Sequence, residues 1–361
     1  MFTTSDSRVL SVKTNATRFE NMPVEHLSTT CDSTARSSYS DGKKQLESVQ
    51  HLIEFYKSHS GPSGCKLSRP FTVEMLLEID IDELELIRDD IEVIIKLGEG
   101  EFGEVFKAIW RGELLIAVKK PRQKMDFLGS RREANALHKL RHKHVVQLLG
   151  ICTQPRDEPF LIILEYMAKG DLLRWLKNES RRLSIRKHVS ILAQIADAMQ
   201  YLEANNVIHR DLRCVNVLVD EDETIKLSDF GLARLLEDQK VYKSETQFPI
   251  RWTAPEAAYE PHNYSVKSDV WSFGVLMYEV LTNGGLPYED LRVDEIHRRI
   301  VAGLRLPNPN PNDSTCCDLY EWMLKCWNLE RSYRPMFLEL HRMLECAQER
   351  LEQTKPHVFD A

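Results

Sequence analysis

IHRDLRCVNVLV, residues 208–219, and LSDFG, residues 227–231, contain the polar side chains from which we interpret the rest of the chain. Asp211, Asn216 and Asp229 stand in otherwise apolar surroundings. Transfer of a phosphoryl group from ATP to a hydroxyl requires a carboxylate that orients the nucleophile and oxygen ligands for the magnesium ions that neutralise the triphosphate. Because these three residues can supply both, the stretch predicts a phosphoryl-transfer site.

The spacing of this stretch, HRD-x(4)-N followed by DFG, resembles the catalytic loop and the metal-binding loop of protein kinases. The resemblance covers about residues 91–346. It implies a two-lobed α+β fold, with a small β-rich N-terminal lobe that contains one key helix and a large helical C-terminal lobe. It also implies ATP and Mg²⁺, with Asp211 as the catalytic base and with Asn216 and Asp229 as metal ligands.

The composition fits a soluble globular protein better than a nucleic-acid binder or a membrane protein. The 361 residues are 42% hydrophobic and carry a formal net charge of −7. A nucleic-acid binder would usually show a concentrated basic face, and no apolar run reaches the roughly 20 residues that span a bilayer. The eight cysteines form no CxxC pair and the N-terminus does not resemble a signal peptide. These features favour a cytoplasmic protein with reduced thiols and leave recruitment to membrane-associated complexes open.

Residues 1–71 resemble part of a Src-homology-2 domain. Residues 9–12 match a central strand, and residues 46–60 carry apolar side chains at helical spacing before a Gly-Pro-Ser-Gly turn. That family binds phosphotyrosine through a buried arginine on an earlier strand, and no arginine here matches it. We therefore expect a partial domain that does not bind phosphotyrosine, followed by an acidic and partly helical linker at residues 72–90.

Residues 91–110 predict two strands around a glycine loop of the form GxGxxG. That pattern also opens dinucleotide-binding folds, but an extended run follows here where such a fold requires a helix. The kinase resemblance implies that Lys119, at the end of the apolar run LIAVK, contacts the α- and β-phosphates and pairs with Glu133 in a helical stretch. The implied nucleotide contacts are Leu97, Gly98, Glu99, Gly100, Glu101, Phe102, Gly103, Glu104, Val105, Ala117, Lys119, Leu164, Glu165, Met167 and Leu218.

Two further apolar runs, residues 144–152 and 159–167, have the length of strands. Aligned on the kinase pattern, Leu164 is the gatekeeper beside the adenine pocket, and Glu165 begins the hinge. Many Src-like enzymes have threonine at the gatekeeper position, so Leu164 departs from that pattern. The resulting division is an N-terminal lobe at 91–164, a hinge at 165–170, a C-terminal lobe at 171–346 and a tail at 347–361.

Two positions favour tyrosine over serine or threonine as the acceptor. Serine/threonine kinases usually have a lysine two residues after the catalytic aspartate, whereas this chain has Arg213 within a stretch that resembles HRDLRAAN of Src-type tyrosine kinases. The stretch FPIRWTAPE is also close to the Src-type form. The resemblance implies that Pro249 gives an apolar platform for a phenol ring and that Arg213 belongs to the catalytic set.

Residues 232–256 correspond to the activation segment of kinases, and Tyr242 lies in its polar centre. Phosphorylation there would add nearly two negative charges, which Arg210 and Arg234 could hold. We therefore expect Tyr242 to be an activating phosphorylation site.

Several residues are expected to support the site from the C-terminal lobe. Asp269, at the start of a nearly continuous apolar helix, should accept backbone N–H bonds from the catalytic loop. Arg334 matches the arginine that pairs with the glutamate of the APE motif, here Glu256. The amphipathic stretch at residues 337–353 should close the lobe.

The sequence thus predicts a non-receptor protein-tyrosine kinase of Src-like type that acts on tyrosine-bearing protein substrates. A pseudokinase or scaffold is the alternative from another class, and the presence of Lys119, Asp211, Asn216 and Asp229 disfavours it. A dual-specificity or serine/threonine kinase is disfavoured by Arg213 and Pro249. We expect no nucleic-acid partner.

Overall fold

The computed structural model divides the chain into two compact units, residues 1–78 and 79–361. It describes residues 9–13, 19–23, 28–31, 37–40, 45–46, 84–100, 103–121, 134, 137–138, 140–155, 158–178, 183–229, 234–235, 249–259 and 263–353.

Short antiparallel strands form the described part of the first unit. One pair is β1 (Val9–Lys13) with β2 (Phe19–Pro23). A three-stranded sheet has the order β3-β4-β5, with bounds Ser28–Cys31, Ser37–Ser40 and Gln45–Leu46. The strand predicted at residues 9–12 is therefore present, and the helix predicted after it lies outside the described residues.

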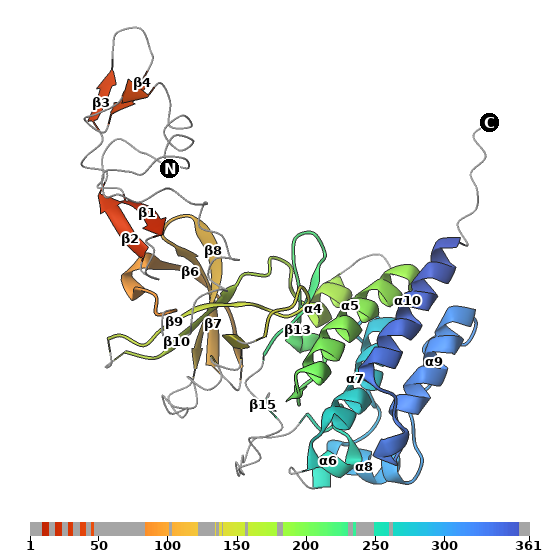
Figure 1. Cartoon of the computed structure of the whole chain (residues 1–361). Coiled ribbons are helices and arrows are strands. Elements are labelled where there is room, and N and C mark those ends of the chain that lie inside the picture. The colour runs from red at the N-terminus through yellow and green to blue at the C-terminus, as the bar shows by residue number, and fades with distance from the viewer. Residues whose placement is uncertain are drawn as a thin grey trace, which may run out of the picture. The chain divides into compact units, whose positions relative to one another are not determined.

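A five-stranded antiparallel sheet forms the N-terminal lobe of the second unit (Figure 1). Apolar and β-branched residues dominate its strands, as expected for a sheet with a packed face. Ile116, Val118 and Ile162 are buried between the strands and the rest of the lobe. In sheet order the strands are β6 (Ile91–Gly100), β7 (Gly103–Trp110), β8 (Leu114–Pro121), β10 (Leu161–Glu165) and β9 (Leu148–Cys152).

Part of the predicted linker belongs to this sheet. The Leu86 amide donates to the Ile151 carbonyl at 2.8 Å, and the Ile151 amide donates to the Leu84 carbonyl at 3.0 Å. Gly150 leaves room for this segment because it has no side chain. A Cβ at this position would lie only 2.6 Å from the Leu86 side chain. The segment therefore extends the β9 edge, and the 3-10 turn η3 (Arg88–Asp90) leads into β6. Leu84 is buried, so packing against the sheet begins before residue 91, and the domain boundary expected at residue 91 stays a prediction.

Helices form most of the C-terminal lobe, packed around α5 and α7 (Figure 1). Their bounds are α4 (Leu172–Asn178), α5 (Ile185–Ala204), α6 (Pro255–Tyr259), α7 (Val266–Leu281), α8 (Val293–Val301), α9 (Ser314–Cys326) and α10 (Phe337–Gln353). Two 3-10 turns accompany them, η4 (Cys214–Asn216) and η6 (Arg331–Tyr333).

Small strands carry the functional loops between these helices. A three-stranded sheet has the order β11-β13-β14, with bounds Gly170–Asp171, Val217–Val219 and Ile225–Leu227. A second pair joins β12 (Val207–Ile208) to β15 (Arg234–Leu235). These short pairings fix the residues before and after the catalytic loop.

The two central helices follow the sequence pattern. The side chain of Ser184 caps α5 by accepting a hydrogen bond from the Lys187 amide. The predicted core face of α5 is buried at Val189, Leu192, Ala196 and Met199. Helix α7 is buried on nearly all sides, as its continuous apolar sequence predicted.

The last helix continues beyond the predicted end of the lobe at residue 346. Helix α10 runs to Gln353, buries Ala347, and receives a hydrogen bond from Arg186 at the Leu351 carbonyl. The amphipathic pattern of α10 continues past residue 346, so its apolar face remains packed against the lobe there. Among the described residues, no helix is long and apolar enough to cross a membrane.

Candidate active site

Asp211 lies in the loop between β12 and η4, and each of its carboxylate oxygens has a polar neighbour within 3.0 Å. Its side chain is only 3% exposed. The Asn216 Nδ2 donates to Asp211 Oδ2 at 2.7 Å, and Arg213 Nη2 donates to the same oxygen at 3.0 Å. Arg213 Nε lies 2.8 Å from Asp211 Oδ1. One amide and one cation therefore fix the orientation of the carboxylate.

The backbone of this loop is held by α7, as predicted for Asp269. Its Oδ2 accepts from the His209 amide at 2.7 Å and its Oδ1 accepts from the Arg210 amide at 2.9 Å. Arg210 has a positive φ of 70°, a conformation that costs free energy for a residue with a side chain. Burial raises the pKa of Asp269 to about 7, and the two amide bonds oppose that rise. The aspartate thus stabilises a strained turn.

His209 packs in the core. The ring is fully buried, its Nε2 lies 3.1 Å from the Ser228 carbonyl, and burial lowers its pKa. A buried imidazole with a lowered pKa favours the neutral form, which suits a structural role.

The structure brings Lys119 and Asp229 together from opposite lobes. Lys119 is the buried lysine of β8, and its Nζ lies 2.9 Å from Asp229 Oδ1. Asp229 follows β14 with a positive φ of 59°. Ser228 ties this turn to the catalytic loop, because its amide and its hydroxyl both donate to the Asn216 carbonyl at 2.9 Å. Three segments distant in the sequence therefore meet at one place.

The oxygen atoms at this place suit a magnesium ion. The Nδ2 of Asn216 is used by Asp211, so the Oδ1 is the atom available for a ligand. The Asp229 side chain is 28% exposed. No group of three or more His, Cys, Asp or Glu side chains that could hold a metal ion is found in the part of the chain that the structure describes. A site with few protein oxygens fits Mg²⁺, which keeps waters and is bound largely through substrate phosphates.

The glycine loop is a hairpin in which one glycine is sterically required. Gly98 pairs with Val105 and Gly100 pairs with Gly103. At Gly103, φ is +136° and a Cβ would lie 2.2 Å from the Lys120 carbonyl oxygen. At Gly98 a Cβ would meet nothing within 4 Å, so its surroundings are open. The hairpin therefore approaches β8 closely at Gly103 and leaves free space at Gly98.

Two residues predicted to contact the nucleotide, Glu99 and Glu104, form ion pairs with Lys96 through their side chains. Lys96 Nζ lies 2.7 Å from Glu99 Oε2 and 2.6 Å from Glu104 Oε1. These exposed ion pairs connect β6 with β7 and raise the pKa of Lys96. Any nucleotide contact of Glu99 and Glu104 would therefore come from their backbone.

The residues predicted to surround adenine lie on neighbouring strands. Ala117 pairs with Leu164 across β8 and β10, and Val105 pairs with Lys119 across β7 and β8. Met167 is buried in the connection that follows β10. These pairings bring the predicted adenine contacts of the N-terminal lobe next to the lysine.

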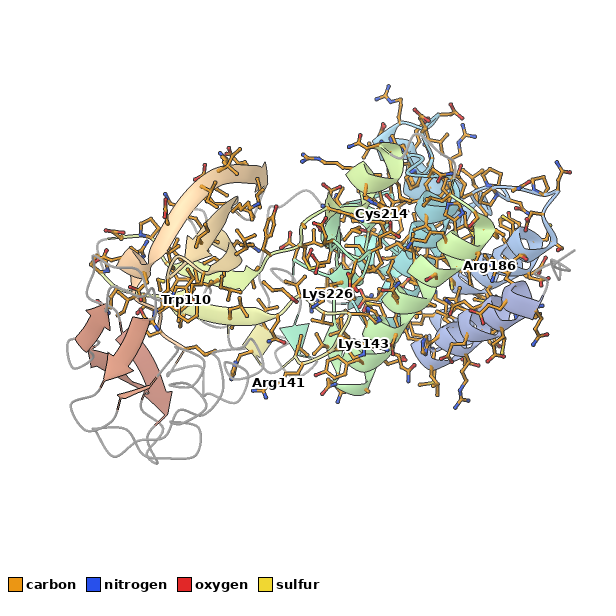
Figure 2. The ribbon with its side chains drawn as sticks, turned by 90° about the horizontal axis from the view of Figure 1, so that it is seen from above. Trp110, Arg141, Lys143, Arg186, Cys214 and Lys226 are labelled. Carbon is orange, nitrogen blue, oxygen red and sulfur yellow. The ribbon has the colours of Figure 1, made fainter. Side chains whose placement is uncertain are left out.

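The hinge carries an ion pair that the sequence did not reveal. Lys226 Nζ contacts both carboxylate oxygens of Glu165 at 2.8 and 2.7 Å, and Glu165 Oε1 also accepts from the Gln147 amide at 2.8 Å. Lys226 belongs to β14 (Figure 2), three residues before Asp229. The predicted hinge is thus fixed to the strand that leads to Asp229.

Some predicted residues lie outside the described residues: Glu101, Phe102, Glu133, Phe230 and Tyr242. Ala134 and Leu137, near Glu133, are helical and buried. The predicted pairing of Lys119 with Glu133 stays a prediction.

The predicted pair of Glu256 and Arg334 is present. Arg334 Nη1 and Nη2 donate to the two carboxylate oxygens at 2.6 and 2.9 Å, and the arginine side chain is fully buried. A bidentate pair of this kind fixes both position and orientation. It therefore anchors α6, just after the predicted acceptor-binding residues, to the base of the lobe.

Comparisons with known proteins agree with this arrangement. Residues 91–344 match the family model described as protein tyrosine and serine/threonine kinase. The tyrosine-protein kinase SPK-1 of Girardia tigrina is 37% identical over 323 residues, which cover 85% of this chain and 63% of that protein. The tyrosine-protein kinase SRK2 of Spongilla lacustris is 39% identical over 310 residues, which cover 83% of each chain. The chain thus spans less than two thirds of the length of the first relative.

The matched region contains both lobes and every described residue of the site, from the glycine hairpin to Arg334. On the motifs, the two-lobed fold and this match, the chain belongs to the protein tyrosine and serine/threonine kinase family.

Proposed function

We propose that the protein is a non-receptor protein-tyrosine kinase that transfers the γ-phosphate of Mg·ATP to tyrosine hydroxyls of protein substrates. One observation carries the proposal: Lys119 and Asp229 are in contact while Arg213 and Asn216 hold the Asp211 carboxylate in the adjoining loop. Phosphoryl transfer depends mainly on positioning and electrostatic stabilisation, and these groups are already fixed relative to one another.

Each group has a role in the proposed reaction. Asp211 orients the substrate hydroxyl and accepts its proton, and Lys119 binds the α- and β-phosphates and pairs with Glu133. Asn216 and Asp229 would hold Mg²⁺, which when bound neutralises charge on the phosphates. The glycine hairpin covers the triphosphate, and its backbone can approach because glycines leave room.

The choice of tyrosine is supported by Arg213. Its guanidinium pairs with Asp211 and also lies over the ring of Trp252, 5.7 Å from the centroid. Trp252 follows Pro249, the residue expected to support a phenol ring. The printed names of both relatives describe tyrosine-protein kinases, in keeping with this choice.

Phosphate transfer to poly(Glu,Tyr) from labelled Mg·ATP tests the proposal. We expect phosphotyrosine from the parent protein and none from Asp211→Asn, and phosphoamino-acid analysis of a mixed protein substrate should give phosphotyrosine without phosphoserine. Transfer to serine would overturn the tyrosine assignment. No transfer by a folded, ATP-binding parent, even after treatment with an activating kinase, would favour a scaffold instead.

The gatekeeper should decide which ATP-competitive inhibitors bind. Leu164 pairs with Ala117 across β10 and β8, and as the gatekeeper it is expected to obstruct the route to the back of the predicted adenine pocket. We expect Leu164→Thr to bind inhibitors that require a small gatekeeper about tenfold more tightly than the parent, the effect of a small change of pocket volume. Inhibition constants for one such compound, beside one that contacts only the hinge, provide the measurement. Equal affinities of parent and variant for the first compound would contradict the assignment.

We also propose that phosphorylation of Tyr242 activates the enzyme. β15 pairs with β12 so that Arg234 lies opposite Ile208, two residues before Arg210. The backbone at Arg234 therefore lies beside the segment that leads to Arg210, which supports the proposal that these two arginines hold the added phosphate. After treatment with an activating kinase, we expect Tyr242→Phe to stay at the activity of the untreated parent. Tyr259→Phe, which changes a tyrosine 65% exposed on α6, is the matched control and should be activated normally.

A further inference from the structure

Glu279 is a buried acid in the most apolar helix of the lobe. It lies in α7 among buried Val275, Met277 and Val280, and it is 2% exposed. A carboxylate in such surroundings is costly unless donors surround it. Its partners therefore show what the residue does.

The donors to Glu279 come from two different functional segments. Trp252 Nε1, in the segment before α6, donates to Glu279 Oε2 at 2.8 Å. The Cys214 amide, at the start of η4 in the catalytic loop, donates to the same oxygen at 3.1 Å. Burial and the neighbouring Glu279 raise the pKa of the Cys214 thiol, so that side chain is an inert neighbour. One carboxylate oxygen thus joins the acceptor side of the site to the catalytic loop.

Trp252 also connects Glu279, through Arg213, to the Asp211 carboxylate. Arg213 stacks over the Trp252 ring and pairs with Asp211. Ser272 of α7 also donates its hydroxyl to the Trp252 carbonyl at 2.8 Å, so α7 holds this residue at its side chain and at its backbone. A shift of the indole would therefore move the guanidinium that orients the catalytic carboxylate.

We propose that Glu279 is a positioning residue for tyrosine phosphorylation, which sets Trp252 and the catalytic loop at the separation that places Arg213 against Asp211 for a phenol substrate. The inference rests on the proposed tyrosine kinase activity. It differs from the role of Asp269, which accepts hydrogen bonds from two backbone amides of the catalytic loop. Glu279 instead couples that loop to the acceptor side, so its effect should appear in the kinetics of the protein substrate.

The test compares Glu279→Gln, Trp252→Phe and the double variant with the parent. Glutamine keeps an oxygen acceptor and removes the charge, and phenylalanine keeps an aromatic ring under Arg213 and removes the N–H donor. For each single variant we expect kcat/KM for a tyrosine peptide to fall about tenfold, the effect of one hydrogen bond to a charged group, while KM for ATP changes by about twofold or less. Because both changes weaken the same hydrogen bond, the double variant should lose no more activity than the more impaired single variant.

Phe273→Leu is the control for loss of packing in the same helix. Phe273 meets Phe337 of α10 edge to face at 5.7 Å, away from the catalytic loop. Phe273→Leu should lower the melting temperature without a selective change in kcat/KM for the tyrosine peptide. If Glu279 had only a structural role, Glu279→Gln would give the same result. If Glu279→Gln does not fold, Trp252→Phe decides the matter by itself.

The outcomes separate this inference from the proposed function. A parent that phosphorylates tyrosine, with variants whose peptide kinetics match the parent, overturns only the role of Glu279. Single effects that multiply in the double variant also overturn it, because they mean that the two residues act independently. A folded parent without tyrosine transfer overturns the proposed function itself.

Discussion

Asp211→Asn is expected to lower kcat for tyrosine phosphorylation by about a thousandfold, within the range that a positioned general base contributes. Asparagine cannot take the substrate proton, and it removes the anion that Arg213 contacts through both Nε and Nη2. The residues proposed to bind the triphosphate are unchanged, so KM for ATP should stay near the parent value. Steady-state kinetics on a tyrosine peptide, with ATP binding measured separately, provide the test.

The matched control for Asp211→Asn is Asp220→Asn, which changes an acid outside the site. Asp220 Oδ1 accepts from the Ala168 and Glu221 amides, and an asparagine oxygen can accept the same bonds. Its kcat should equal that of the parent. If Asp211→Asn kept more than about a tenth of the parental kcat, Asp211 would not be the general base of the reaction.

Arg334→Ala is expected to destabilise the second unit by about 3 kcal/mol, the lower end for removal of one partner from a buried pair. The guanidinium donates to both oxygens of Glu256 and also to the Asn328 and Lys267 carbonyls, at 2.8 Å each. Alanine would leave all these acceptors without their donor. The lower end applies because the Glu256 side chain is 20% exposed and can recover some hydration.

Denaturant unfolding of the parent, Arg334→Ala and Arg334→Lys measures this effect. Lysine retains the charge but cannot form the bidentate pair, so its free energy of unfolding should lie between the other two. Because the pair anchors α6, peptide kinetics should also weaken under conditions where Arg334→Ala remains folded. A midpoint of unfolding equal to that of the parent would mean that the pair contributes nothing to stability.

The order of the kinase motifs along the chain allowed most of the fold and much of the site to be predicted from the sequence. Asp211, Lys119 and Asp229 lie in recognisable patterns, and each pattern has a fixed structural context. The roles of Asp269 and Arg334 were also predicted, and their hydrogen bonds confirm them. The kinase pattern thus predicts contacts between residues as far apart in the sequence as Glu256 and Arg334.

Contacts that depend on three-dimensional neighbours could not be predicted. The pairing of Glu165 with Lys226 and the strand-like addition at Leu84 follow from the packing of the sheet and carry no motif. Glu279 did leave a signal, since an acid within the apolar run of α7 requires buried donors. The sequence alone could not identify Trp252 and Cys214 as those donors, because they come from separate loops.

Asp269 and Glu279 lie ten residues apart on one helix, which is about 15 Å of rigid α-helix. One carboxylate holds the backbone before the catalytic base, and the other holds the indole on the acceptor side. Helix α7 therefore positions both the catalytic loop and the Trp252 segment. A small displacement of α7 within the lobe moves them together and changes their mutual distance little. The geometry of the reaction thus tolerates thermal motion of the surrounding lobe, and substitutions that bend α7 between these two residues should be more harmful than those that shift it as a whole.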